Sequence, residues 1–234
     1  MSDFNYENIL FLDIETAPIV YEYKQLPDAT KKLWDTKFRF NQQETPEEIY
    51  KKSGIYAEFA KVICISVAIV MKNKTIRVKS FYGDDEKELL KEFSELLQTK
   101  YNKENQMLCA HNGREFDFPF LCRRMLINGI KLPAILDLSG KKPWEVKHLD
   151  TMDMWKFGDY KNFTSLNLLA HVFGIPTPKD DIDGSDVARV YYEQKDLNRI
   201  VTYCQKDAVT VAQLYLKLKC EEIISQENIA FPLI

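Results

Sequence analysis

Residues 8–15 form an apolar segment that ends in two acidic residues, Asp13 and Glu15. An apolar run of this length that stops at polar residues is typical of a central strand whose carboxyl end opens onto a site. Side chains two positions apart on a strand point to the same side, so Asp13 and Glu15 project together while Ile14 points into the core. The segment therefore predicts a central strand that presents two carboxylates at one place.

The rest of the chain shows strand and helix patterns in a recognisable order. Residues 62–71 are rich in β-branched side chains and residues 75–81 alternate apolar with polar, which predicts a hairpin. Further elements are expected at 84–97 (helix), 106–111 (strand), 116–128 (helix), 146–150 (strand), 166–173 (helix) and 197–224 (helix). Three antiparallel strands followed by alternating helices and strands predict an α/β fold with a mixed sheet and helices on both faces, in the order of a ribonuclease H-like domain.

Residues 18–60 do not fit that order and are interpreted as an insertion between the first two strands, with short helices at 29–38 and 46–53. The insertion follows the acidic strand directly. Two roles stay open for it: it forms part of a groove beside the acidic residues, or it covers the edge of the sheet. The chain is otherwise interpreted as one domain, 1–234, with a short C-terminal tail at 225–234.

Composition is that of an ordinary globular protein: the 234 residues are 45% hydrophobic and 29% charged. The longest apolar stretch, 62–71, is much shorter than the ~20 residues of a membrane helix, so no membrane contact is expected. The five cysteines lack a CxxC pair and no leader-like segment precedes the first strand, which predicts free thiols and a cytoplasmic location. The formal net charge of −3 disfavours a protein that holds duplex DNA by charge alone.

Two further acidic motifs lie far from the first strand. One places Asn112 at the end of an apolar strand and Asp117 in the first turn of the next helix. The other places Tyr203 and Asp207 four residues apart, hence on one face of a helix. Mg²⁺ and Mn²⁺ prefer oxygen ligands, and sites of phosphoryl transfer supply a few carboxylates rather than a complete cage. The four acidic residues therefore indicate metal-assisted cleavage of phosphodiesters.

In this order, the three motifs resemble those of the DEDD superfamily of 3′–5′ exonucleases, and the Tyr-x-x-x-Asp spacing is similar to its DEDDy branch. The histidine branch has His at the position of Thr202. The sequence Asn-Gly-Arg-Glu-Phe-Asp at residues 112–117 is similar to the proofreading domains of family B DNA polymerases. These 234 residues contain no polymerase domain, so the chain resembles the stand-alone predicted exonucleases that are related to those proofreading domains.

The resemblance implies a metal-dependent 3′–5′ exonuclease that uses two divalent cations, Mg²⁺ or Mn²⁺. Asp13 would bridge the two ions. Glu15 and Asp207 would complete the first metal site, and Asp117 would help to hold the second. Tyr203 together with Glu15 would orient the attacking water.

The resemblance also implies a substrate and its contacts. Thr16 and Asn112 are similar to positions that contact the terminal nucleotide, while Phe116 either packs beneath the site or stacks on a base. The expected substrate is nucleic acid with a free 3′ end, single-stranded or frayed, with DNA favoured over RNA and nucleoside 5′-monophosphates as products. Two alternatives stay open: a nucleic-acid-binding module without catalysis, and an endonuclease of the ribonuclease H type.

Overall fold

The computed structural model describes residues 5–159, 161–177 and 182–232. They contain a six-stranded sheet with the strand order β5-β4-β1-β2-β3-β6. The strands are β1 (Ile9–Pro18), β2 (Ala60–Val70), β3 (Ile76–Tyr82), β4 (Met107–Ala110), β5 (Leu149–Asp150) and β6 (Ile229–Ala230). The pairs β1–β2 and β2–β3 are antiparallel, whereas β4 is parallel to β1 and β5 is parallel to β4. The mixed sheet expected from the sequence is confirmed.

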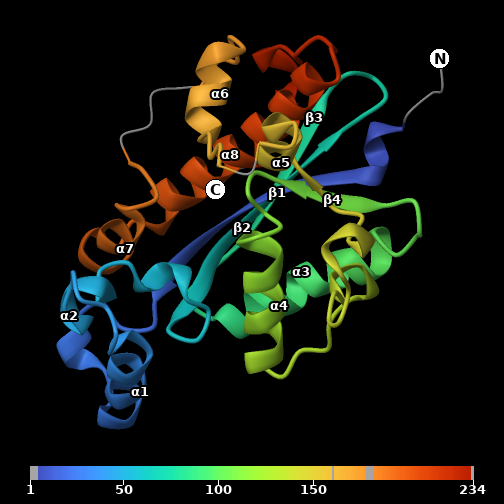
Figure 1. Cartoon of the computed structure of the whole chain (residues 1–234). Coiled ribbons are helices and arrows are strands. Elements are labelled where there is room, and N and C mark those ends of the chain that lie inside the picture. The colour runs from blue at the N-terminus through green and yellow to red at the C-terminus, as the bar shows by residue number, and fades with distance from the viewer. Residues whose placement is uncertain (1–4, 160, 178–181, 233–234) are drawn as a thin grey trace.

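Helices cover both faces of this sheet, with α3 and α4 on one face and α8 on the other (Figure 1). The described α-helices are α1 (Asp28–Phe38), α2 (Pro46–Tyr50), α3 (Glu86–Lys100), α4 (Asp117–Ile127), α5 (Thr151–Lys156), α6 (Leu166–Val172), α7 (Val187–Arg189) and α8 (Leu197–Leu218). The ribonuclease H-like fold expected from the element order is therefore confirmed. None of the helices in the described part of the chain has the length and hydrophobicity that a bilayer crossing requires.

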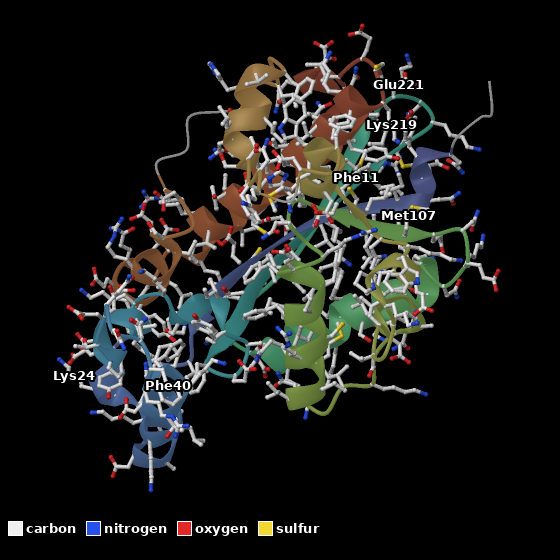
Figure 2. The ribbon with its side chains drawn as sticks, in the orientation of Figure 1. Phe11, Lys24, Phe40, Met107, Lys219 and Glu221 are labelled. Atoms are coloured by element: carbon white, nitrogen blue, oxygen red, sulfur yellow. The ribbon has the colours of Figure 1, made fainter. Side chains whose placement is uncertain are left out.

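The central strand β1 separates two apolar cores, because its alternate residues face opposite sides of the sheet. Leu12 and Ile14 pack in the core beneath α3 and α4, whereas Phe11 packs in the core beneath α8. The Phe11 ring lies 5.4 Å from the ring of Tyr215, and Figure 2 shows it beside that helix. Asp13 lies two residues after Phe11 on β1, so both side chains face the same side of the sheet. Its carboxylate therefore belongs to the α8 side of the sheet.

The pairing of β1 with β2 is irregular at the level of the acidic residues. Glu15 lies opposite Cys64, but Thr16 lies opposite Val62, so β2 has one extra residue at this point. A bulge of this kind increases the local twist and redirects the neighbouring side chains. The irregularity follows directly after Glu15 and so helps to set the direction of its carboxylate.

The strand predicted at 146–150 is shorter than expected. β5 has only two residues, and α5, which was not predicted, begins directly after it. Asp150 is the N-cap of that helix and accepts the backbone N–H groups of Met152 and Asp153. Because α5 spans fewer than two turns, its sequence is too short to show a helical period.

The helix predicted at 197–224 ends earlier, at Leu218. The chain then reverses, with Cys220 in the left-handed region at φ 59°. After the reversal, Ile224 packs back on α8 and exchanges two hydrogen bonds with the side-chain amide of Gln213. The apolar Ile224 is thus buried by a turn rather than by further helix. The described part of the tail also contains β6, which was not predicted and pairs in parallel with β3.

The segment between β1 and β2, residues 19–59, forms its own small apolar cluster. The segment contains α1 and α2, so the two short helices expected there are present, the second one shorter than predicted. Trp34 is fully buried at the centre of the cluster, and its indole N–H donates to the carbonyl oxygen of Pro46 at 2.7 Å. Phe40, by contrast, lies at the outer end of the segment, away from the sheet, and is 79% exposed (Figure 2).

A buried ion pair joins α3 and α4 to the sheet. Oε2 of Glu86 lies 2.6 Å from Nη2 of Arg124, and both side chains are almost fully buried. Oε1 of Glu86 accepts the backbone N–H of Val62 in β2 at 2.7 Å. Nη1 of Arg124 donates to the carbonyl oxygen of Ala57 at 2.8 Å. Each charge therefore has several partners, and the loss of one charge leaves the other buried and uncompensated.

We expect Glu86→Gln to lower the free energy of unfolding by about 3–5 kcal/mol, because it leaves the Arg124 guanidinium without its buried counter-charge. Urea denaturation followed by circular dichroism measures the change. The matched control is Glu88→Gln, which breaks the exposed Glu88–Lys91 pair on the same helix and should leave stability unchanged within error. Equal effects of the two substitutions would contradict the role given to the buried pair.

Candidate active site

The five residues predicted for catalysis come from three elements that meet at the central strand β1. They are Asp13 and Glu15 of β1, Asp117 at the start of α4, and Tyr203 and Asp207 on α8. The pKa of Asp13 is raised well above its usual value by burial and then by the negative charges of Glu15, Asp207 and Asp117. Repulsion of this strength requires short separations. The structure therefore brings the three motifs, which are far apart in the sequence, to one place.

Asp13 and Glu15 share their surroundings with a thiol. The pKa of Glu15 is raised well above its usual value by burial and then by the charge of Asp207. The thiol of Cys204 donates to the backbone oxygen of Asp13 at 3.3 Å. One ligand atom each of Asp13, Glu15 and Cys204 lies within 4.8 Å of the others. Burial raises the pKa of the Cys204 thiol well above its usual value, so that it stays a neutral donor beside the carboxylates.

Asp117 reaches the site because α4 begins very close to the end of β4. A Cβ atom added to Gly113 would lie 2.4 Å from Cβ of Ala110, so only glycine fits there. The Gly113 carbonyl accepts the N–H of Phe118 at 2.9 Å and starts the helix. Burial raises the pKa of Asp117 from 3.8 to about 7, while backbone N–H groups, including that of Ile14 in β1, act in the opposite direction. Asp117 therefore lies against the central strand.

Tyr203 and Asp207 are four residues apart on α8, so both point from the same face of that helix. Burial raises the pKa of Tyr203, and the charges of Asp207, Glu15 and Asp13 raise it further. A hydrogen bond with Asp207 acts in the same direction. The phenol therefore stays protonated at all working pH values, and its O–H is a hydrogen-bond donor among carboxylates.

The donor set fits a hard divalent cation. Asp13, Glu15 and Asp117 offer carboxylate oxygens, which Mg²⁺ and Mn²⁺ prefer. Within the described residues, Oδ2 of Asp13 is buried without a hydrogen-bond partner. A buried carboxylate oxygen without a donor is costly, and a cation is the partner that removes this cost. Cys204 is not a suitable ligand for such an ion, since its protonated thiol is engaged with the backbone of Asp13.

Of the three residues predicted to bind substrate, Thr16 follows Glu15 on β1, and Asn112 and Phe116 lie in the segment just before Asp117. Oγ1 of Thr16 donates to the carbonyl oxygen of Gly54 at 2.7 Å, so this side chain contacts the segment between β1 and β2. Asn112 has a left-handed backbone, φ 63°, and its Oδ1 is buried without a partner in the described part of the chain. The ring of Phe116 packs 5.4 Å from that of Phe120 and against the core beneath α4, in agreement with the packing alternative.

Sequence reasoning missed two polar residues next to Asn112. Nδ1 of His111 is hydrogen-bonded to Oγ1 of Thr151 at 2.9 Å, and its Nε2 donates to the carbonyl oxygen of Thr164 at 2.9 Å. Burial lowers the pKa of His111, which keeps the ring neutral. Asp150 accepts the backbone N–H of Asn112 at 2.9 Å. Asp150 could have been found from the sequence, because an acidic residue followed by Thr151 at the end of a strand is typical of a helix N-cap.

A family model described as "Predicted 3'-5' exonuclease related to the exonuclease domain of PolB" matches residues 55–229, three quarters of the sequence. The chain belongs to this family. The resemblance inferred from the three motifs is thereby confirmed. The matched range includes Asp117, Tyr203 and Asp207, whereas Asp13 and Glu15 lie before it.

Several DNA polymerases are similar to this chain. It is 26% identical over 178 residues to a DNA polymerase of Pyrococcus glycovorans (67% of this chain, 22% of the polymerase) and 26% identical over 141 residues to one of Desulfurococcus sp. strain Tok (55% and 18%). The chain thus spans about a fifth of the length of these relatives. The family B DNA polymerase of Pyrobaculum calidifontis has a similar fold, with a TM-score of 0.60 and 16% identity over 90% of this chain and 24% of the polymerase.

The raised pKa of Asp117 makes the stability of the metal-free protein depend on pH. Asp117 keeps its proton up to about pH 7 when folded but loses it near pH 3.8 when unfolded, so its contribution to stability is present at low pH and is lost as the pH rises through 7. Asp117→Asn removes this titration. We therefore expect the Tm of the wild type relative to Asp117→Asn to increase when the pH falls from about 8 to about 5 in EDTA. A difference in Tm that does not vary with pH would contradict this prediction.

Proposed function

We propose that this protein is a 3′–5′ exonuclease that hydrolyses the terminal phosphodiester bond of single-stranded or frayed nucleic acid, with DNA favoured over RNA, and releases nucleoside 5′-monophosphates. The observation that carries the proposal is the meeting of four acidic residues with a protonated tyrosine at the central strand. Membership of the exonuclease family supports the same reaction. The similarity to DNA polymerases supports DNA rather than RNA as the favoured substrate.

The acidic residues would hold two divalent cations, Mg²⁺ or Mn²⁺. Asp13 would contact both ions, a proposal supported by the charges of Glu15, Asp207 and Asp117 that all act on its carboxyl group. Glu15 and Asp207 would complete one site and Asp117 the other. Bound cations of this kind lower the pKa of a coordinated water and stabilise negative charge on a phosphate.

The residues of the chain itself would orient the reactants. The single O–H of Tyr203 donates to Asp207 in the metal-free protein. Once Asp207 binds a cation, this O–H would turn to a water molecule or a phosphate oxygen as a donor, without losing its proton. Glu15, nearby on β1, can accept a hydrogen bond from the same water. The unpartnered Oδ1 of Asn112 can accept a hydrogen bond from the sugar or base of the terminal nucleotide. Thr16 and Phe116 would form the adjacent walls.

The proposal predicts that purified wild-type protein shortens 5′-labelled single-stranded DNA from its 3′ end when Mg²⁺ or Mn²⁺ is present, and that EDTA abolishes the reaction. Asp13→Asn and Asp207→Asn should lower kcat by about 10²–10³-fold, because each removes a carboxylate that would hold the cations that stabilise the developing phosphate charge. Labelled RNA of the same sequence and a circular DNA are tested beside it. The matched fold control is Glu92→Gln, which changes an exposed acid on α3.

Each outcome of this assay has a distinct meaning. A metal-dependent ladder that is absent with the two variants and with the circle supports the exonuclease, and the faster strand identifies the preferred sugar. Cleavage of the circle would replace the proposal with a ribonuclease H-type endonuclease. Folded protein that binds but cleaves none of the linear strands would replace it with a binding module.

Tyr203→Phe should lower kcat by up to about 10²-fold with little change in KM, because it removes a donor that orients the water but leaves the acidic residues in place. The shape of the pH profile should stay the same, since the raised pKa of Tyr203 keeps its proton on throughout. Tyr191→Phe is the matched control, because the Tyr191 hydroxyl donates to Asp84 at 2.6 Å and lies outside the cluster. Equal rates for wild type and Tyr203→Phe would remove Tyr203 from the mechanism.

A further inference from the structure

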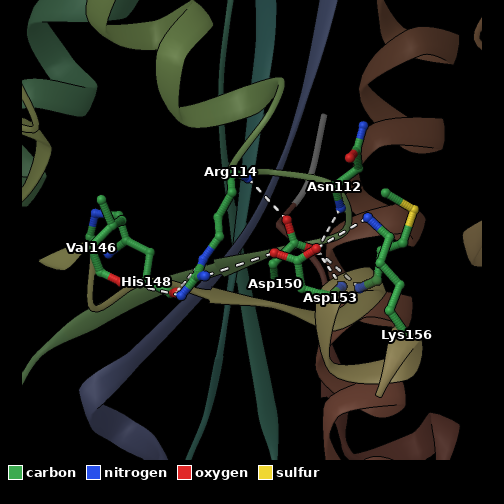
Figure 3. Close-up of polar contacts among 8 residues, drawn as sticks. Asn112, Arg114, Val146, His148, Asp150, Asp153 and Lys156 are labelled. Carbon is green, nitrogen blue, oxygen red and sulfur yellow. Dashed lines mark hydrogen bonds and ion pairs between the residues drawn. The ribbon is translucent and has the colours of Figure 1, made fainter. Parts of the chain in front are cut away.

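Asp150, at the end of β5, is almost fully buried and accepts four backbone N–H groups. Its Oδ1 accepts those of Asn112 at 2.9 Å, Met152 at 2.9 Å and Asp153 at 3.3 Å, and its Oδ2 accepts that of Arg114 at 3.0 Å (Figure 3). Two of these donors begin α5 and two belong to the turn at residues 112–114. One carboxylate therefore holds together two segments that are about 40 positions apart in the sequence.

The turn that Asp150 holds leads directly into α4. Its first residue, Asn112, has φ 63°, a left-handed conformation that a residue with a side chain adopts only when its surroundings enforce it. The carbonyl oxygen of Asn112 then accepts the N–H of Phe116 at 3.0 Å, next to Asp117. Together with the bond from the N–H of Phe118 to the carbonyl oxygen of Gly113, this contact links the position of Asp117 to the turn.

The side chain of Arg114 extends the same contact. Its Nε and Nη2 donate to the carbonyl oxygen of His148 at 3.0 and 2.7 Å, and its Nη1 lies 3.8 Å from Oδ2 of Asp153. Figure 3 shows the guanidinium reaching past β5 while the backbone of the turn faces Asp150. The turn is therefore attached on both sides of the short strand.

A carboxylate is the group that these contacts require. Both oxygens of Asp150 face N–H donors, so an amide at this position would place an N–H group against an N–H group. Figure 3 shows the side chain of Asn112 pointing away from Asp150, and its Oδ1 is buried without a partner among the described residues. The turn thus presents Oδ1 of Asn112 as a hydrogen-bond acceptor that has no partner among the described residues.

We propose that Asp150 is a positioning residue for the nuclease reaction: by fixing the turn at residues 112–114, it directs Oδ1 of Asn112 and the carboxylate of Asp117 toward the substrate. This inference rests on the proposed function. It assigns no contact between Asp150 and the substrate. Asp150 acts through the turn.

Two substitutions distinguish the fixing of the turn at residues 112–114 from the capping of α5. Asp150→Asn keeps the size of the side chain but opposes an N–H group with its amide. Asp150→Ser retains a good N-cap for α5, yet its short hydroxyl cannot serve the turn and the cap together. We expect both variants to lower kcat/KM on single-stranded DNA by about 10²-fold, the effect of a misplacement of about 1 Å at a site. The Tm of Asp150→Ser should fall less than that of Glu86→Gln, because the cap of α5 is kept.

Glu86→Gln is the matched control, because Glu86 is another buried carboxylate that accepts a backbone N–H, but in the core beneath α3 and α4. It should lower the Tm while kcat/KM of the folded protein stays within about twofold of wild type. If Asp150→Ser has wild-type kcat/KM, Asp150 serves only as a helix cap and the proposal is wrong. If loss of activity follows loss of Tm equally in all three variants, the role is merely structural.

A double-mutant cycle tests whether Asp150 affects kcat/KM through the turn that contains Asn112. In an Asn112→Ala background, the loss caused by Asp150→Ser should shrink at least about tenfold, because the two residues act through one turn. Independent, multiplicative losses would overturn the proposal.

Amide hydrogen exchange gives a readout that needs no nuclease activity. Asp150→Ser should lose protection at the amides of residues 112 and 114 while the helix α8 keeps its protection. If wild-type protein cleaves neither DNA nor RNA, the proposed function fails, and the exchange result still shows whether Asp150 holds the turn. Unchanged protection at both amides would overturn the proposal even in an active enzyme.

Discussion

The candidate site brings several carboxylates close together, and the packing of the rest of the chain has to offset the cost of their mutual repulsion. Asp13, Glu15 and Asp117 are placed where little water screens them, and burial raises the pKa of each one. In the unfolded chain these charges are far apart and hydrated, so their approach opposes folding. The packing of two apolar cores around β1 outweighs this cost. The divalent cations that we propose would convert the repulsion into attraction.

The scaffold around the acidic cluster is rigid for identifiable reasons. β1 is paired on both edges and packed on both faces, so the two acids that it carries have little freedom to separate. On the far side of the sheet, the Glu86–Arg124 pair holds α3, α4 and β2 together. At the start of α4, the tight packing of Gly113 against Ala110 fixes where that helix begins. The contact at Gly113 therefore sets the position of Asp117 relative to β1, whereas the ion pair stabilises the core away from the candidate site.

Buried carboxylates in this chain are of two kinds. Glu86 and Asp150 are surrounded by N–H donors, which satisfy their oxygens and join separate segments. Asp13, by contrast, has a buried oxygen without a donor within the described residues. A satisfied carboxylate stabilises the fold, whereas an unsatisfied one indicates where a ligand has to supply positive charge. The turn at residues 112–114 connects one of the satisfied carboxylates, Asp150, to the candidate site.

The fold class and the acidic residues of the candidate site could be predicted from the sequence alone. The spacing of Asp13 and Glu15 on a strand and of Tyr203 and Asp207 on a helix fixes their relative direction, because it follows from the local backbone period. Which residues from distant parts of the sequence come into contact depends on the tertiary structure. The contacts of Asp150 with residues 112 and 114 span 38 and 36 positions, and no periodic pattern encodes them. The early end of α8 is a similar case, since the chain reverses in order to bury Ile224. Short-range geometry is readable from the sequence, whereas hydrogen bonds between remote segments depend on how the whole chain packs.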